Sequence, residues 1–156
     1  MDIFSKIEKE RGMVARIYSD FNAYPESVAA HFELNKALIL SDSAPLPRFE
    51  REFLAYETST YNGNDYCATH HKKAYENLIK VSNRSQGRMD HLSKLAYILT
   101  NRPMDAAGFK SQFISAGFIE AEWQHAVNVI AYFNYTNRLA FAMAMELEPE
   151  YKKSCN

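Results

Sequence analysis

The sequence contains little of what marks several other classes of protein. Among its 156 residues are only two cysteines, five glycines and five prolines. Cys67 and Cys155 lie far apart, and two cysteines in a chain of this size do not make a disulfide scaffold. We therefore predict a reducing, cytoplasmic location, where an interior cysteine is available as a reagent.

Long hydrophobic runs and an excess of one charge are also missing. No stretch of about 18 apolar residues occurs, so we expect no membrane-spanning helix. The first residues lack the basic start and apolar run of a signal peptide. The formal net charge is -1 and no basic stripe occurs, which argues against a nucleic-acid partner.

Helical periodicity is what the sequence does contain. Apolar residues recur at helical spacing, and no segment alternates with period two for long enough to predict a strand. Because no repeat or linker divides the chain, we predict an all-α fold in a single domain covering residues 1–156. The predicted helices cover residues 3–11, 28–40, 48–60, 65–81, 89–100, 105–116 and 120–147, with a further turn within 14–21.

Local signals mark several helix ends. Pro25 suits a first helical position, Asn64 suits the N-cap of the helix that begins at residue 65, and Gly117 suits a helix stop. The segment 120–147 is long and rich in Ala, Phe, Tyr and Met. We expect a helix of this kind to be buried on more than one side, in part by another subunit of a homo-oligomer.

Three residues in the middle of the chain have the chemistry of a reactive site. Cys67 falls in the first turn of a predicted helix, where partial positive charge favours the thiolate. His71 lies four residues later on the same face and is placed to take the thiol proton. Glu52 on the preceding helix is placed to orient the histidine. Purely structural explanations stay open. Cys67 could be a small buried apolar residue, and residues 48–52 could form a solvated charged face.

Other polar and aromatic residues give weaker signals. His70 and His71 point about 100 degrees apart on a helix, so they do not ligate one ion together, and we expect no metal. No glycine-rich nucleotide motif occurs, so we expect no cofactor. Isolated histidines and late aromatic residues are expected to serve packing, solvent contact or an interface: His31, His91, His125, Trp123, Tyr132, Phe133, Tyr135 and Phe141.

The window FEREFLAYETSTYNGNDYCATHHKKA resembles the active-site helix pair of alkylhydroperoxidase D-like (AhpD-like) proteins, the superfamily that includes carboxymuconolactone decarboxylases. That family has a Glu, eleven residues, Cys-x-x-Cys, three residues and a His. Glu52, Cys67 and His71 fall in this register, with Asn64 at the first Cys. The segments 12–18, 24–26 and 133–138 are similar to the peroxidase-related branch of the family.

The resemblance implies an AhpD-like helical bundle with the active site between two central helices. It implies an antioxidant peroxidase that reduces hydrogen peroxide or small organic hydroperoxides, with peroxiredoxin-type chemistry at Cys67. His71 and Glu52 would form the proton relay. It also implies homo-oligomers, often trimers or hexamers. Residues expected to support the site are Asn64, Tyr66 and His70.

Asn64 departs from the family pattern at a position that affects the whole cycle. Because Asn64 has no thiol, Cys67 cannot form the internal Cys-x-x-Cys disulfide. An oxidised Cys67 would have to be resolved by Cys155, by a small thiol or by a partner or adaptor protein. Two further functions stay open. One is an acid/base enzyme like carboxymuconolactone decarboxylase, and the other is a non-catalytic, redox-responsive oligomer.

Overall fold

The computed structural model describes residues 2–80 and 85–147, and within these ranges it contains helices and no strand. The prediction of an all-α fold is therefore confirmed. None of the helices in the described ranges has the length and apolar character needed to cross a membrane. The elements are α1 (Ile3–Arg11), α2 (Arg16–Ser19), α3 (Pro25–Asn35), the π-helix η1 (Lys36–Leu40), α4 (Arg48–Tyr61), α5 (Asp65–Ile79), α6 (Gln86–Asn101), the 3-10 turn η2 (Pro103–Asp105), α7 (Ala106–Ser115) and α8 (Glu120–Ala142).

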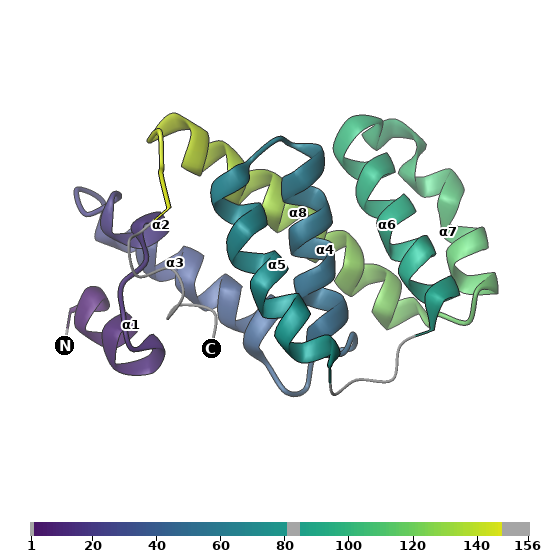
Figure 1. Cartoon of the computed structure of the whole chain (residues 1–156), viewed down its shortest axis with the longest axis horizontal. Coiled ribbons are helices and arrows are strands. Elements are labelled where there is room, and N and C mark those ends of the chain that lie inside the picture. The colour runs from purple at the N-terminus through teal and green to yellow at the C-terminus, as the bar shows by residue number, and fades with distance from the viewer. Residues whose placement is uncertain (1, 81–84, 148–156) are drawn as a thin grey trace.

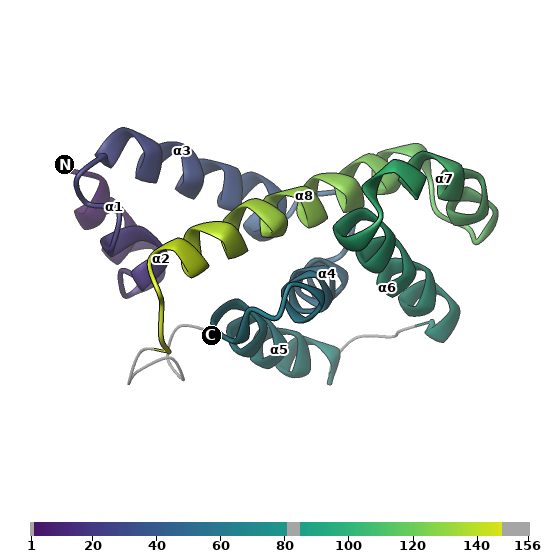
Figure 2. The same ribbon diagram turned by 90° about the horizontal axis from the view of Figure 1, so that it is seen from above.

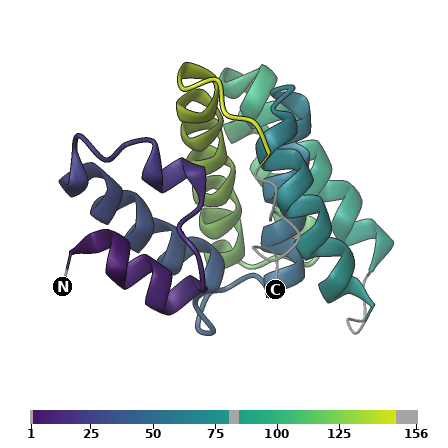
Figure 3. The same cartoon turned by 60° about the vertical axis from the view of Figure 1, so that its left-hand side comes forward.

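The long helix α8 organises the arrangement of the others. It runs across the width of the molecule, with α1, α2 and α3 toward one end and α6 and α7 toward the other (Figure 1, Figure 2). The pair α4 and α5 packs beside it, and α8 separates this pair from the group of α1, α2 and α3 when the molecule is turned (Figure 3). Helix α8 is consequently buried on more than one side, as its apolar sequence predicts.

Two apolar clusters fill the interior. The larger one joins α4, α6, α7 and α8, and Leu54, Leu92, Phe113 and Ile130 are all completely buried in it. The smaller one joins the N-terminal helices to the start of α5 and includes Cys67. Cys67 therefore packs in the apolar cluster that the N-terminal helices share with the start of α5 and with Ala140 of α8.

Several residues that the sequence predicts at helix ends are found there in the structure. Pro25 is at the start of α3, and the Asn64 side chain accepts a hydrogen bond from the Cys67 backbone N–H at the start of α5. Gly12 and Gly117 have φ of 78° and 95°, a left-handed conformation that glycine adopts at little cost.

The predicted end of the last helix is wrong. Helix α8 ends at Ala142 and not near residue 147. Ala144 adopts φ 47°, its N–H donates to Phe141 O, and the Met145 N–H donates to Ala140 O. This is the pairing of a Schellman motif, in which glycine is usual at the left-handed position. Because alanine occupies that position, the sequence gives no stop signal.

Two other boundaries also differ. Helix α6 begins at Gln86, three residues before its predicted start. The segment predicted as the end of one helix, 36–40, is the π-helix η1, in which the Ser41 N–H donates to Lys36 O at 2.9 Å. The guanidinium of Arg51 donates to Ile39 O at 2.6 Å and to Ser41 O at 2.8 Å, and so satisfies carbonyls at this helix end.

The interpretation of 48–52 as a solvated charged face is wrong. Glu50, Arg51 and Glu52 are all at least 96% buried, because α4 is covered by neighbouring helices on both flanks. Glu50 receives two hydrogen bonds from Arg88 of α6, each 2.9 Å long. Arg88 also donates to Glu122 of α8 at 2.8 Å, so one guanidinium joins three helices.

We expect Arg88→Met to lower the free energy of unfolding by about 3 kcal/mol, because it leaves the buried Glu50 carboxylate without its partner. The double variant Arg88→Met, Glu50→Met should regain at least half of this loss, since the most deeply buried carboxylate is then gone and only Glu122, whose side chain is 14% exposed, still lacks Arg88. Urea unfolding at neutral pH measures both. The control Arg102→Met removes an exposed ion pair with Asp105 and should cost less than about 1 kcal/mol. Equal losses in the single and double variants would contradict this account.

Candidate active site

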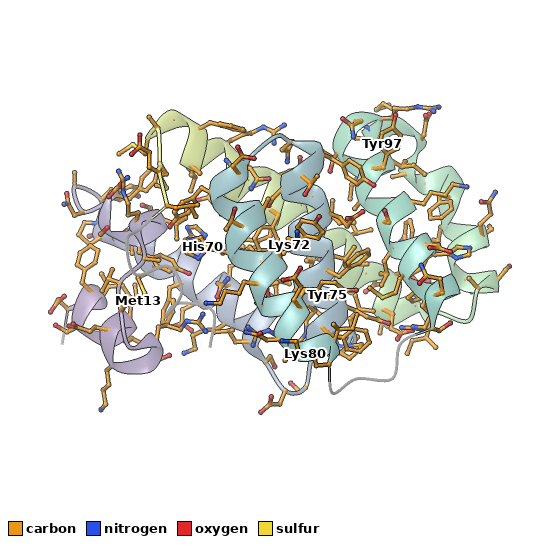
Figure 4. All side chains as sticks on the ribbon, in the orientation of Figure 1. Met13, His70, Lys72, Tyr75, Lys80 and Tyr97 are labelled. Carbon is orange, nitrogen blue, oxygen red and sulfur yellow. The ribbon has the colours of Figure 1, made fainter. Side chains whose placement is uncertain are left out.

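A cavity of about 120 Å³ opens between the N-terminal helices, the central pair and α8. Its walls come from parts of the chain that are far apart in sequence. Figure 4 shows His70 of α5 turned toward the N-terminal helices, on the side where Met13 lies. The polar and charged residues that line the cavity are Arg11, Tyr18, Asn35, Arg48, Glu52, Tyr66, Cys67, His70, His71, Tyr132 and Thr136.

Cys67 is the third residue of α5 and is 3% exposed. Its backbone N–H donates to Asn64 Oδ1 at 2.9 Å, which fixes the first turn of the helix around the cysteine. The remaining N–H dipoles of this turn provide the partial positive charge that favours a thiolate. The local sequence therefore places the sulfur at the end of a helix and at the wall of a cavity.

Glu52 lines the same cavity and is bound by two residues. Its Oε2 is 2.6 Å from His71 Nδ1, and its Oε1 accepts from Arg48 Nε at 2.7 Å. Burial alone would raise the pKa of Glu52, but the charges and hydrogen bonds of His71 and Arg48 lower it to about 2. An ionised carboxylate accepts the Nδ1–H of His71. In the neutral ring, Nε2 is then the nitrogen that can receive a proton.

The His71 ring is also fixed by packing. Phe133 of α8 contacts it edge-on, with ring centroids 4.5 Å apart. The neighbouring residue His70 contacts Tyr66, which lies one turn earlier in α5, and their ring centroids are 4.8 Å apart. The residues of α5 that face the cavity are thus ordered by aromatic contacts as well as by Glu52.

A chain of amide side chains ties the start of α5 to α8. Asn64 donates to the backbone oxygen of Asn137 at 3.2 Å, and Asn137 Nδ2 donates to Ser59 Oγ at 3.0 Å. Asn62 donates to Asn137 Oδ1 at 2.8 Å and to Asn134 Oδ1 at 3.1 Å. Because Asn64 and Asn137 are 97% and 100% buried, these bonds are shielded from water and set the position of Cys67 relative to α8.

A second polar group, around the hydroxyl of Tyr132, also lines the cavity. The Tyr132 hydroxyl is 2.7 Å from His31 Nε2 and accepts from Asn35 Nδ2 at 3.2 Å. Burial raises the pKa of Tyr132 well above its usual value, and burial lowers the pKa of His31 to about 4. The expectation that Tyr132 serves packing or an interface misses its position in the cavity lining, where its hydroxyl group has polar partners.

The structure brings most of the predicted site residues together. Cys67, His71 and Glu52 line one cavity, and so do the supporting residues Tyr66 and His70. Asn64 acts from behind, through the backbone of Cys67. Cys155 lies outside the described residues.

Sequence reasoning missed two cationic residues of the site. Arg48 is not among the predicted site residues, although its i,i+4 spacing to Glu52 is a signal for the ion pair that the structure contains. Arg11 comes from α1 and carries no local signal, since only the folded chain brings α1 to the cavity. Within the part of the chain that the structure describes, no three His, Cys, Asp or Glu residues gather as a metal site would require.

Solved structures share this arrangement of helices. A peroxidase-related protein from Silicibacter sp. superposes with a TM-score of 0.80 at 23% identity, over 98% of this chain and 86% of the other. A peroxidase-related protein from Ralstonia eutropha, described as an alkylhydroperoxidase AhpD core, gives 0.78 at 21% identity, over 95% and 84%. No protein-family model and no curated protein matches the sequence.

These likenesses define the fold. The chain has the all-α fold of the alkylhydroperoxidase D core, and the AhpD-like fold expected from the resemblance is confirmed. Both similar proteins are described as uncharacterized, so they carry no information on substrate or mechanism.

We expect the free energy of unfolding to fall as the pH drops from about 6.5 to about 4. In this window the unfolded chain binds a proton at residue 31, while the folded chain does not, because burial holds the pKa of His31 at about 4. The loss should reach about 3 kcal/mol at pH 4. His125 contributes in the same direction, since burial lowers its pKa as well. The lowered pKa of Glu52 adds a further loss below about pH 4.5.

Urea unfolding at several pH values in wild type and His31→Gln measures this effect. The pH dependence should be shallower in His31→Gln, because the group that titrates is gone. His91→Gln, which changes a histidine on α6, is the matched control and should keep the wild-type slope. A slope that His31→Gln leaves unchanged would show that other groups cause it.

Proposed function

We propose that this protein is a thiol peroxidase that reduces hydrogen peroxide or small organic hydroperoxides through Cys67. The observation that carries the proposal is the hydrogen bond between His71 Nδ1 and buried Glu52, on the wall of the cavity that Cys67 also lines. It directs the basic nitrogen of His71 away from Glu52 and makes it available to a thiol proton. The AhpD-like fold is consistent with this chemistry.

In the proposed reaction, His71 accepts the proton of the Cys67 thiol. The thiolate sulfur attacks the distal oxygen of the hydroperoxide, so a sulfur–oxygen bond forms and the oxygen–oxygen bond breaks. Cys67 becomes a sulfenic acid, oxidised by two electrons, and the peroxide is reduced to an alkoxide. The alkoxide takes the proton from His71 and leaves as the alcohol.

Glu52 supports both proton transfers without leaving its partners. An ionised carboxylate stabilises the imidazolium that forms when His71 accepts the proton. It also keeps Nδ1 protonated, so that Nε2 is the nitrogen that exchanges protons. Arg48 balances the buried charge of Glu52, with the Nη2–Oε1 distance at 2.6 Å. The exchange can therefore repeat without protonating Glu52, whose pKa is about 2.

One observation favours a second candidate function. Arg11 and Arg48 both line the cavity, and a carboxymuconolactone decarboxylase-like enzyme needs basic groups for the carboxylates of its substrate. Such an acid/base reaction does not use a redox thiol. Cys67→Ser separates the two functions, because it abolishes peroxide reduction and leaves acid/base groups in place.

We expect a pulse of tert-butyl hydroperoxide to convert Cys67 to a sulfenic acid that a dimedone-type trap captures. Intact-protein mass spectrometry should show one adduct in wild type and none in Cys67→Ser. Glu52→Gln should slow trapping by roughly 100-fold, because the neutral amide no longer stabilises the imidazolium. Glu57→Gln, a change in a carboxylate on the same helix outside the cavity, should keep the wild-type rate.

Far-ultraviolet circular dichroism of each variant shows whether a slower rate reflects chemistry or loss of fold. Oxidation of folded wild type no faster than that of a free cysteine would overturn the peroxidase proposal. Trapping that proceeds without any turnover, whatever thiol is supplied, would instead favour a redox-responsive protein.

A further inference from the structure

Helix α5 carries no second cysteine beside Cys67. The residue one turn earlier is Asn64, and both ends of its amide are occupied, by the Cys67 N–H and by Asn137 O. Cys67 is the one cysteine in the part of the chain that the structure describes. On the proposed function, a second thiol must therefore come to the sulfur from elsewhere.

The depth of Cys67 limits what that thiol can be. Cys67 is 3% exposed and is reached through a cavity of about 120 Å³. A volume of that size admits a few heavy atoms at a time. A small molecule with a flexible thiol arm fits it, whereas a thiol on a folded protein surface has to be presented on a protruding segment.

The charges at the cavity determine which small thiol it favours. Among the described residues that line the cavity, Glu52 is the only carboxylate, and Arg48 and His71 already bind it. Arg11 has no carboxylate partner among the described residues, and its charge acts on the hydroxyl of Tyr18, which also lines the cavity. The described part of the lining thus has a positive charge at Arg11 that no carboxylate of the lining balances.

We propose that the reductant of oxidised Cys67 is a small thiol that carries a carboxylate, and that Arg11 binds this carboxylate. This inference rests on the proposed peroxidase function. Arg48 lies on the same cavity and adds to the attraction, although Glu52 offsets most of its charge. A neutral thiol of the same size would react at the same sulfur without this attraction.

The cycle balances with two molecules of the thiol. The first thiolate attacks the sulfur of Cys67 sulfenic acid, the sulfur–oxygen bond breaks, and the hydroxide takes a proton and leaves as water. This gives a mixed disulfide between Cys67 and the small thiol. A second thiolate attacks the sulfur of the bound thiol, releases the small-molecule disulfide and returns Cys67 to the thiolate. In sum, one hydroperoxide and two thiols give one alcohol, one water and one disulfide.

The test separates the second half of the cycle from the first. Wild type is oxidised with one equivalent of tert-butyl hydroperoxide, which is uncharged, and the sulfenic acid is verified by trapping in a parallel sample. The oxidised protein is then mixed with 3-mercaptopropionate, 2-mercaptoethanol or cysteamine, which carry a carboxylate, no charge and an ammonium. Quenched intact-mass spectra give the rate of mixed-disulfide formation, corrected to the thiolate concentration of each compound.

Arg11→Gln is the informative variant. The ratio of the 3-mercaptopropionate rate to the 2-mercaptoethanol rate should fall roughly threefold, which corresponds to the loss of a solvent-exposed ion pair. Dividing by the neutral thiol removes any change in the sulfur itself. Lys9→Gln is the matched control, since it removes a positive charge from the same helix at a residue outside the cavity lining, and it should keep the wild-type ratio. The wild-type ratio should also fall as salt rises from about 0.05 M to about 1 M.

Other outcomes overturn the inference in distinguishable ways. If no sulfenic acid forms, the peroxidase function itself fails. If it forms but Arg11→Gln leaves the ratio unchanged, the carboxylate is not recognised there. If wild type loses its sulfenic acid without added thiol, and Cys155→Ser retains it, the protein resolves itself and needs no carboxylate thiol.

Discussion

A carboxylate that is 99% buried has to be paired, and the pairing of Glu52 constrains the two central helices. Arg48 supplies one partner from the preceding turn of α4, and His71 supplies the other from α5. The pair of helices therefore has one register in which the charge of Glu52 is satisfied. In that register, His71 faces the cavity with its basic nitrogen, and Cys67, one turn earlier, faces the same space.

A second constraint acts at the start of α5, on the N-terminal side of Cys67. The buried amides of Asn64 and Asn137 hold the start of α5 against α8. Together with the contact of Glu52 to His71, they fix α5 at two points on either side of Cys67. The sulfur is therefore positioned by two polar contacts that each join α5 to a different helix. This is a firmer support than apolar packing alone, because hydrogen bonds in a dry interior tolerate little displacement.

Much of the fold could be predicted from the sequence, because each helix buries a stripe of apolar residues and has signals at its ends. Pro25, Asn64 and Gly117 stand where the sequence predicts. The end of α8 could not be predicted, since Ala144 takes a left-handed conformation that depends on the contacts of the folded chain. The π-helix was missed for a similar reason: the Arg51 side chain that satisfies its end comes from the next helix.

Some residues of the candidate site could likewise be predicted from the sequence, and others could not. The spacing of Cys67 and His71 is local, so it is visible in the sequence, and the position of Glu52 follows from the family pattern. Whether the charged run that contains Glu52 faces water depends on which helices cover α4, and the periodicity of α4 does not contain that information. Arg11 and Tyr132 reach the cavity from opposite ends of the chain, so their part in it appears only once α1 and α8 are placed.

The amide at position 64 has a consequence for the lifetime of the protein under stress. A site with two thiols stores its oxidised state as a disulfide, which resists further attack. On the proposed chemistry, the Cys67 sulfenic acid cannot form a disulfide with residue 64, because Asn64 has no thiol. A second peroxide molecule then competes with the incoming thiol for the same sulfur. When the second peroxide reacts first, it oxidises the Cys67 sulfenic acid to a sulfinic acid, which thiols do not reduce. On this chemistry, the ratio of thiol to peroxide around the protein determines whether Cys67 is recycled or irreversibly oxidised. The protein would lose its activity when the thiol is depleted.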